Sequence, residues 1–593
     1  VGLVALSIIL WTRIRTVHLM RFDIENSDFQ PKWIRPIRNI SAMFGNDVVN
    51  FEFAGLKTSN ITFALDNSKI TLNRAIDYRE YLDENNIILD QDIRKNLIIS
   101  QIENLCEELS LTTMDNKESS NLFDEVTGLC QYPTALVGEI DERFLALPNE
   151  VLFLTLKNNQ KYFCLKDKEQ NFSNKFIFVV NNIISDSNEE KIIKDTEKLV
   201  RARLSDAEFF INEDLNKPLS QRTKELEKVI FHQKLGSIQD KILRLQNLAK
   251  FIGVFVPRSD FSLIEKSVNL IKSDLTTKAV AELPELQGRI GEFYATKQGE
   301  NPKIAKAIYE HYLPVGPNSP LPQSPLGITL SISDKIDSIV GFFLCNEKPT
   351  SSKDPFGLRR YTLAIIRIVF EFDIAFPIRI SVEKSLNTYS SKLLKEFLHK
   401  EDSKFIDNKK KLIEEIITFF VERLKSYLKE DQNLKTEIIN VVIDEYLSNL
   451  NSHRYCNILY LAKKIKFLDS YIKNDDNEEI LNLYKRSANI LAIEEKKDKK
   501  RYNGKVSRLH LKDKNEKILY ASIKKVSAKH KKLVVKGSFE EAFFILKIIE
   551  KPLTNFFDNV LINQDDKGLR ENRLKLLNKV VSLFNITADI SKI

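Results

Sequence analysis

The sequence predicts an α+β protein that is predominantly α-helical and divided into several domains. The chain has 593 residues, which is enough for about three to five domains of ordinary size. Short runs that alternate apolar and polar residues, broken by Gly and Asn, occupy the stretch from 30 to 75. From about residue 188 onward, apolar residues recur at the spacing of an α-helix. We therefore expect strands near the start and helices in the rest.

The first 190 residues predict a mixed α+β module behind a short apolar opening. The opening run VGLVALSIILW has 11 residues, fewer than the roughly 20 that a membrane-spanning helix needs, so we expect no membrane anchor. The run NDVVNFEFAG (46–55) has the alternation of a strand. Residues 144–165 and 174–183 predict two further strands around a helix, with a turn at KNN.

Later segments predict helices that each have one apolar face. In VRARLSDAEFF, in KLIEEIITFFVERLKSYL and in the last 40 residues, apolar side chains are three or four residues apart, so each set points to one side of a helix. The positions predicted to pack inward are Val200, Leu204, Ala207 and Ile211, then Leu412, Ile416, Phe420 and Leu424, and finally Leu574, Leu577, Val581 and Phe584.

The segment KDPFGLRRYTLAIIRIV (353–369) predicts a helix that starts at an Asp-Pro pair. Asp354 has the side chain of an N-cap, and Pro355 suits the first helical turn. The apolar stripe that follows consists of Leu358, Thr362, Ile365 and Val369. The arginines off this stripe are Arg359, Arg360 and Arg367. They either face a polyanion or form an ordinary solvated face.

We expect the chain to be divided into five segments. The predicted segments are 1–20, an atypical N-terminal run; 21–190, a partial α+β module; 191–385, helical with Pro- and Gly-rich loops; 386–480, a helical linker; and 481–593, a C-terminal helical domain.

Positive charge is concentrated in the C-terminal segment. The net charge of the chain is +8, and residues 494–536 contain 16 Lys or Arg against 5 Asp or Glu. A cluster of this density can neutralise the phosphates of a nucleic acid. The alternative is a solvated loop in a protein rich in Lys, Asn and Ile.

The usual motifs of catalysis and metal binding are absent from the sequence. We find no GxxxxGK[ST], GxGxxG, GxSxG or HExxH, and the seven histidines are scattered. The five cysteines are far apart and form no CxxC pair, which favours buried free thiols in a reducing compartment. Residues alone therefore indicate a helical, multidomain protein with a basic C-terminal third.

Seven ordered segments and one C-terminal stretch carry a resemblance to a known family. The seven are LPNEVLFLTLKNNQKYF (147–163), VRARLSDAEFFINEDLNKPL (200–219), HQKLGSIQDKILRL (232–245), KSDLTTKAVAELPELQGRIGEFYA (272–295), HYLP (311–314), SDKIDSIVGFF (333–343) and SSKDPFGLRRYTLAIIRI (351–368). They resemble the β subunit of bacterial tetrameric glycyl-tRNA synthetase. NFFDNVLINQDDKGLRENRLKLL (555–577) resembles the DALR-type helical anticodon-binding domain that this family shares with arginyl-tRNA synthetases.

The resemblance implies a division of labour between two subunits. In the family, the α subunit holds the active site that activates glycine with ATP and Mg²⁺, and the β subunit binds tRNA(Gly). We therefore expect no catalytic residue and no cofactor in this chain, a cytoplasmic α2β2 complex with an α subunit, and no membrane partner. Family members begin with a longer segment carrying an EIGTEELP-like motif, so we also expect this chain to be N-terminally truncated.

The resemblance also implies residues that bind tRNA. Arg570, Asn572 and Arg573 match the signature of the anticodon-binding helix; the alternative for them is helix packing and pairing with Asp565 or Asp566. Additional basic candidates for tRNA contact are Arg201, Arg203, Arg359, Arg360, Lys499, Lys500 and Arg501.

The middle of the family is similar to an HD-type metal phosphohydrolase domain. Such a site needs a His-Asp doublet and a distal Asp to hold a metal that activates water. Here the doublet position is Ser273-Asp274, and Asp334 is the distal candidate. We expect poor metal affinity and a retained scaffold, with no metal bound. Two other functions stay open from the sequence: an HD-type metal phosphohydrolase, and a truncated remnant without function.

Overall fold

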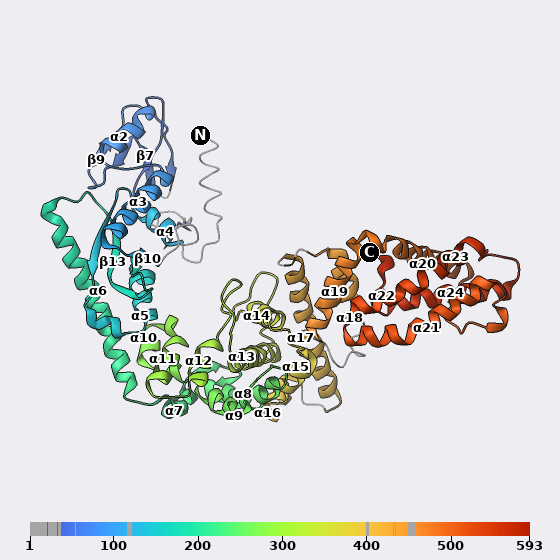
Figure 1. Cartoon of the computed structure of the whole chain (residues 1–593). Coiled ribbons are helices and arrows are strands. Elements are labelled where there is room, and N and C mark those ends of the chain that lie inside the picture. Colours follow the sequence, from blue (N-terminus) through green and yellow to red (C-terminus); the bar gives the residue numbers. More distant parts are fainter. Residues whose placement is uncertain are drawn as a thin grey trace. The chain divides into compact units, whose positions relative to one another are not determined.

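The computed structural model describes residues 20–21, 32–33, 37–53, 55–114, 121–398, 402–430, 432, 434–448 and 457–592 (Figure 1). The predicted segment 1–20 thus lies almost wholly outside the described residues. The chain divides into two compact units, residues 1–214 and 215–593. The first unit includes nearly all of helix α6 (Asp186–Leu215), so the predicted limit at residue 190 falls inside a helix. The finer division into five segments stays a prediction.

The first unit starts with short strands in small sheets. They confirm the alternating pattern of residues 30 to 75, and NDVVNFEFAG supplies two of them, β5 and β6. The elements are β1 (Met20–Arg21), β2 (Lys32–Trp33), β3 (Ile40–Ser41), β4 (Met43–Phe44), β5 (Asp47–Val48), β6 (Glu52–Phe53), β7 (Leu56–Ser59), β8 (Ile61–Phe63), β9 (Lys69–Thr71), η1 (Ala75–Asp77) and α2 (Tyr78–Glu84).

A four-stranded antiparallel sheet forms the main core of the first unit. Its strand order is β10-β12-β13-β11, and α3 and α4 pack on it through Ile102, Phe123, Phe163 and Ile177. The elements are α3 (Gln91–Leu109), β10 (Thr112–Thr113), α4 (Asn121–Leu129), β11 (Pro133–Glu139), η2 (Glu142–Ala146), α5 (Asn149–Phe153), the π-helical η3 (Leu154–Asn159), β12 (Phe163–Lys166) and β13 (Phe172–Asn181).

The predicted order of elements in 144–183 is wrong in one respect. The helix precedes both strands, and KNN ends the π-helical turn, so β12 and β13 form a hairpin. Val151, Leu152, Leu154 and Leu156 are all buried. A short, continuous apolar run fits a buried helix and a buried strand equally well. Hydrophobic periodicity therefore could not show which part of 144–165 is helix and which is strand.

Helices account for most of the rest of the chain, as predicted. Every position predicted to pack inward is buried in α6, α14, α17 and α24. The first elements of the second unit are α7 (Leu219–Arg222), η4 (Thr223–Lys228), β14 (Ile230–His232), β15 (Gly236–Ser237), α8 (Ile238–Gly253), α9 (Phe261–Leu270), η5 (Ser273–Thr276), α10 (Lys278–Glu282), η6 (Pro284–Leu286), α11 (Arg289–Lys297), α12 (Pro302–Glu310), α13 (Pro325–Leu344), α14 (Leu358–Glu371) and α15 (Ile378–Leu386).

Helix α13 is the centre of this helical region. All its residues from Leu326 to Leu344 are buried, because α8, α12, α14 and α15 pack around it (Figure 1). A helix with no solvated side must satisfy its polar side chains internally. Asp334, Lys335 and Asp337 on α13 are therefore bound to neighbouring groups, as described below.

The start of α14 differs from the prediction. The helix begins at Leu358, after Gly357 in the left-handed region with φ of 67°. Asp354 still caps it, because its carboxylate accepts hydrogen bonds from the amides of Leu358 and Arg359, both at 2.9 Å. Arg367 donates to the carbonyl oxygens of two residues in the preceding Pro-rich loop, both at 3.0 Å. Arg367 therefore holds this loop against α14.

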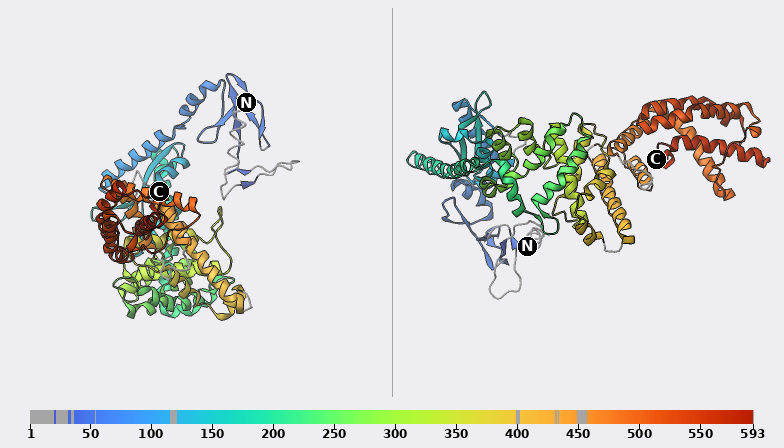
Figure 2. Two further views of the ribbon diagram at one scale, coloured as in Figure 1. Left: turned by 90° about the vertical axis from the view of Figure 1, so that its right-hand side faces the viewer. Right: turned by 90° about the horizontal axis from the view of Figure 1, so that it is seen from below.

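The C-terminal part of the second unit is a set of long helices. Helix α20 packs on α24, and α21 packs on α22, α23 and α24 (Figure 1). Figure 2 shows this C-terminal set of helices, coloured orange to red, from two further directions. The elements are α16 (Ser391–Leu398), α17 (Asp402–Glu430), α18 (Thr436–Ser448), α19 (Ile458–Lys473), η7 (Asp475–Asn477), α20 (Glu478–Asp498), η8 (Arg508–His510), α21 (Lys514–Lys536), α22 (Phe539–Leu546), η9 (Lys547–Ile549), α23 (Glu550–Asn559), α24 (Lys567–Asn585) and η10 (Ile590–Lys592). Among the described helices, none combines the length and apolar character needed to cross a membrane.

Candidate nucleic-acid interface

Helix α21 presents a dense row of lysines to solvent. It carries eight lysines and a single acidic residue, Glu516, which is buried. All eight lysines are exposed, and none pairs with an acidic residue in the described part of the chain. The lysines are Lys514, Lys517, Lys524, Lys525, Lys529, Lys531, Lys532 and Lys536. Unpaired ammonium groups on one rigid helix are suited to the phosphates of a nucleic acid.

The opposite side of α21 fixes the helix in the bundle. Leu519, Ile523, Val526 and Val534 are buried there, at the spacing of a helix face. A capping box starts the helix: the Asp513 side chain caps the first turn and the Glu516 carboxylate accepts from the Asp513 amide at 3.0 Å. The lysine row is therefore carried by a well-anchored element.

Arg573 and Glu516 form a buried ion pair that joins α24 to α21. The Arg573 Nε lies 2.5 Å from Glu516 Oε1, and its Nη1 donates to the Leu561 carbonyl at 2.7 Å. Arg573 is 7% exposed and Glu516 is fully buried. Of the alternative considered for this arginine, helix packing agrees with the structure, but its acidic partner is Glu516 and not Asp565 or Asp566. Asp566 instead caps the N-terminus of α24.

Arg570 makes a comparable link from α24 to α20. Its guanidinium binds the carboxylates of Glu494 and of Asp498, the latter at 2.6 Å. The hydrogen bond with Glu494 and the one with Asp498 raise the pKa of Arg570 above its ordinary value. A hydrogen bond from Asn563, reinforced by Arg570, holds the pKa of Glu494 below its ordinary value. Arg570 is thus charged and already paired within the protein.

Asn572 ties the loop after α20 to α24. Its Oδ1 accepts the Ser507 amide at 2.7 Å, and its Nδ2 donates to the Ser507 carbonyl at 3.1 Å. The side chain is buried. The tRNA contacts predicted for Arg570, Asn572 and Arg573 stay a prediction; what the structure places at these positions is internal support for the helices that carry the lysines.

The three basic residues directly after α20 lie in the same helical bundle as α21 and α24. Lys499 ends the helix in the left-handed conformation with φ of 49°. Lys500 pairs with Glu571 of α24 at 2.7 Å, whereas the Arg501 side chain is 86% exposed and 3.6 Å from Glu495. Lys499 and Arg501 are therefore more available to a polyanion than Lys500.

The remaining basic candidates are distributed over both units. Arg201 pairs with Asp141 at 3.2 Å, and Arg203 is exposed on the same helix, α6. In the second unit, Arg359 donates to the Thr350 carbonyl and Arg360 is exposed. Their predicted roles stay predictions, and none of them belongs to a row of exposed basic residues as long as the one on α21.

The HD-like positions form a buried charged centre that contains lysines. Ser273, Asp274 and Asp334 are all buried. The ammonium groups of Lys241 and Lys272 lie 3.3 and 3.4 Å from the two oxygens of Asp334. Burial alone would raise the pKa of Asp334, but these ammonium groups outweigh it and hold the pKa below its ordinary value.

This donor set does not fit a metal. In HD-type sites the ligands are His and Asp, whereas here Ser273 donates to the Asn269 carbonyl at 3.3 Å and two lysines bind Asp334. Burial raises the pKa of Asp274 to about 6, and its Oδ2 already accepts the Gly288 amide at 2.5 Å. In the part of the chain that the structure describes, no three His, Cys, Asp or Glu side chains are grouped as metal ligands. The structure therefore gives no support to a metal phosphohydrolase.

Sequence reasoning missed two features of these sites. The basic cluster at 494–536 was visible, but the predicted contacts stopped at Lys499, Lys500 and Arg501; the run of Lys at helical spacing in α21 was the signal for an exposed face. The lysines beside Asp334 come from α8 and from the link between α9 and η5, and only the fold brings them together.

Comparisons with known proteins match this arrangement. The family model described as glycyl-tRNA synthetase beta subunit matches residues 6–444, and that described as DALR anticodon binding domain matches residues 480–590. The chain is 34% identical to the glycine–tRNA ligase beta subunit of Rickettsia bellii (strain OSU 85-389), 36% to that of Rickettsia conorii and 35% to that of Rickettsia africae. Each comparison spans 569 residues, 95% of this chain and 79% of the relative.

A helical chain with a DALR-type domain and a lysine-rich helix in that domain defines a component of an aminoacyl-tRNA synthetase. The extent of both matches makes the assignment more specific. The chain belongs to the glycyl-tRNA synthetase beta-subunit family. The resemblance seen in the sequence is thereby confirmed, as is the predominantly helical, multidomain fold.

Proposed function

We propose that this chain binds tRNA(Gly) and presents it to an α subunit that attaches glycine with ATP and Mg²⁺. The observation that carries the proposal is the row of eight exposed lysines on α21, inside the segment that matches a DALR anticodon binding domain. Lysine contacts to phosphates position the RNA, and unpaired bases of the anticodon loop supply sequence information. The chain itself holds no cofactor in this proposal, and it works in the cytoplasm.

The role of the internal pairs follows from this arrangement. Acidic side chains near α21 would weaken its attraction for phosphates, because like charges on protein and RNA repel. Glu494, Asp498 and Glu516 are each bound to Arg570 or Arg573. These three carboxylates are thereby neutralised within the bundle, whereas the eight lysines of α21 stay exposed.

The test is glycylation of tRNA(Gly) by this chain mixed with the cognate α subunit, beside each subunit alone. We expect charging only in the mixture, and native mass measurement of the mixture should give α2β2. Tight tRNA binding by this chain without the α subunit supports the proposed division of labour. A chain that folds but neither binds tRNA nor supports charging would instead support a remnant without this function.

A further inference from the structure

The first compact unit contains a polar cavity that none of the sites above uses. Its volume is about 640 Å³, within the range typical of small-molecule sites. It lies between strand β8, helix α2, the start of α3 and the ends of α4 and β13. The residues that line it are Arg38, Asn39, Thr62, Phe63, Ala64, Leu65, Asn67, Tyr78, Leu82, Ile87, Ile88, Leu89, Arg94, Gly128, Leu129, Cys130, Gln131 and Asn181.

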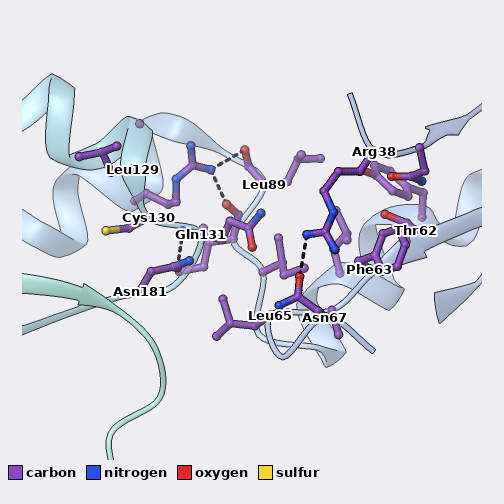
Figure 3. Close-up of a pocket in the computed structure, with 18 residues that line it drawn as sticks. Arg38, Thr62, Phe63, Leu65, Asn67, Leu89, Leu129, Cys130, Gln131 and Asn181 are labelled. Atoms are coloured by element: carbon purple, nitrogen blue, oxygen red, sulfur yellow. Dashed lines mark hydrogen bonds between the residues drawn. The ribbon is translucent and has the colours of Figure 1, made fainter. Parts of the chain in front are cut away.

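The chemistry of the lining selects the kind of ligand. Two arginines and four carboxamide side chains line the cavity, whereas none of the described residues in the lining is acidic. Figure 3 shows Arg38, Phe63 and Asn67 on one side and Gln131 and Asn181 on the other. A cavity with two arginines and no carboxylate favours an anionic ligand. The Asn and Gln side chains favour a ligand that also has hydrogen-bond donors and acceptors.

Both arginines are held at the wall by bonds to uncharged groups. Arg94 Nη1 donates to the carbonyl oxygens of Ile88 at 2.5 Å and Leu89 at 3.0 Å, and its buried Nε has no hydrogen-bond partner. Arg38 Nη1 donates to Asn67 Oδ1 at 3.2 Å (Figure 3). Neither guanidinium has a carboxylate partner in the described residues, so the positive charge of both is available to an anionic ligand.

The carboxamides are also fixed in place. Asn181 Oδ1 accepts the amides of Gln131 and Tyr132 at 2.7 and 2.9 Å, which fixes the orientation of its side chain. With its Oδ1 occupied, Asn181 offers a ligand only its Nδ2 donors, whereas the Gln131 carboxamide in the same lining can form a pair of hydrogen bonds with the edge of a nucleobase. Phe63 and Tyr78 add aromatic rings to the lining, and unstacked bases pack on aromatic rings.

We propose that this cavity binds one nucleotide, with its phosphate at Arg38 and Arg94 and its base at the carboxamides and the aromatic rings. The nucleotide is either free in solution or an unstacked residue of an RNA strand, because both present the same chemistry. The site lies in the other compact unit from α21, so its test does not depend on tRNA binding by the C-terminal domain.

Hydrogen–deuterium exchange of the full chain locates the ligand directly. The chain carries Lys524→Ala and Lys525→Ala, which weakens RNA binding by α21, and the probes are AMP, a single-stranded RNA tetranucleotide and inorganic phosphate. We expect slower exchange in residues 61–67 and 128–131 with AMP, or with the tetranucleotide alone. The first result assigns a free nucleotide and the second a nucleotide within RNA. No slowing with either probe, or equal slowing with inorganic phosphate, overturns the proposal.

Paired arginine variants test the role of the charge. Arg38→Gln should weaken binding of the active probe by about tenfold, or about 1.4 kcal/mol, because one charge-assisted contact is lost. Arg79→Gln is the matched control, since Arg79 is exposed in the same unit but does not line the cavity. Equal affinity in both variants would contradict the site, and circular dichroism confirms that each variant is folded.

Discussion

The guanidinium of Arg573 and the carboxylate of Glu516 form a buried pair 2.5 Å apart that joins the last long helix to the lysine-rich helix. The two residues are 57 positions apart in the sequence. Arg573 belongs to the signature that suggests anticodon contact, yet its side chain is 7% exposed. The Arg573 side chain therefore holds α21 against α24 inside the bundle.

Breaking this pair should destabilise the bundle. Arg573→Met leaves the Glu516 charge buried without its partner, so we expect a loss of about 3–5 kcal/mol in the free energy of unfolding, measured by urea denaturation followed by circular dichroism. Arg573→Met with Glu516→Gln should lose less than the sum of the single changes. Additive losses would show that the two side chains do not interact.

Removing the Asn572 side chain should release the loop after α20. Asn572→Ala leaves the amide and carbonyl of Ser507 without their partner, at a cost of about 1–3 kcal/mol. Hydrogen exchange should accelerate in residues 499–510. Asn578→Ala on the same helix is the control, and equal exchange in the two variants would argue against this link.

Contacts between residues close together in the sequence could be predicted, and contacts between residues far apart in the sequence could not. Apolar spacing located the buried faces of α6, α14, α17 and α24, because a helix face is set by residues three and four apart. The acidic partners of Arg570 and Arg573 lie 57 to 76 residues away in the sequence. The nearby Asp565 and Asp566 were the natural choice from sequence, but Asp566 was already needed as an N-cap.

The same limit applies to the candidate sites. Ser273 at the position of the HD-type His can be read from the sequence, whereas Lys241 of α8 and Lys272, between α9 and η5, are brought beside Asp334 of α13 only by the fold. The cavity in the first unit is assembled from five separate stretches of sequence. No short motif marks such a set.

Buried His530 should make stability depend on pH. Burial lowers the pKa of His530 to about 4 from 6.5. Between these values the unfolded chain binds a proton that the folded chain does not, so the free energy of unfolding falls as the pH falls from 6.5 to 4. The loss is about 3 kcal/mol at pH 4, since one pKa unit equals about 1.4 kcal/mol.

Urea denaturation at pH 4, 5, 6 and 7 measures this effect. His530→Leu should remove about 3 kcal/mol from the change in stability over this range, whereas His510→Leu, at an exposed position of the same domain, should keep the full change. The explanation fails if His530→Leu has the same pH dependence as the unsubstituted chain.

The chain should also be insensitive to removal of divalent metal. Lys241 and Lys272 already balance the charge of Asp334, so no bound cation is needed for the HD-like centre to fold. Thermal unfolding with and without EDTA should give the same Tm. A Tm that falls in EDTA and returns with added Mn²⁺ would show that this centre holds a metal.

The most direct test of the account is kcat/KM for tRNA(Gly) in glycylation by the α and β subunits together. Lys524→Ala with Lys525→Ala removes two exposed charges from α21, and Lys410→Ala with Lys411→Ala removes two exposed adjacent lysines from α17. We expect the α21 pair to lower kcat/KM by about tenfold or more through KM, and to reduce the slope of log K for tRNA binding against log salt by about 1–2. The α17 pair should change neither quantity. Unchanged kcat/KM and salt dependence in the α21 pair would contradict the claim that this helix is the tRNA interface.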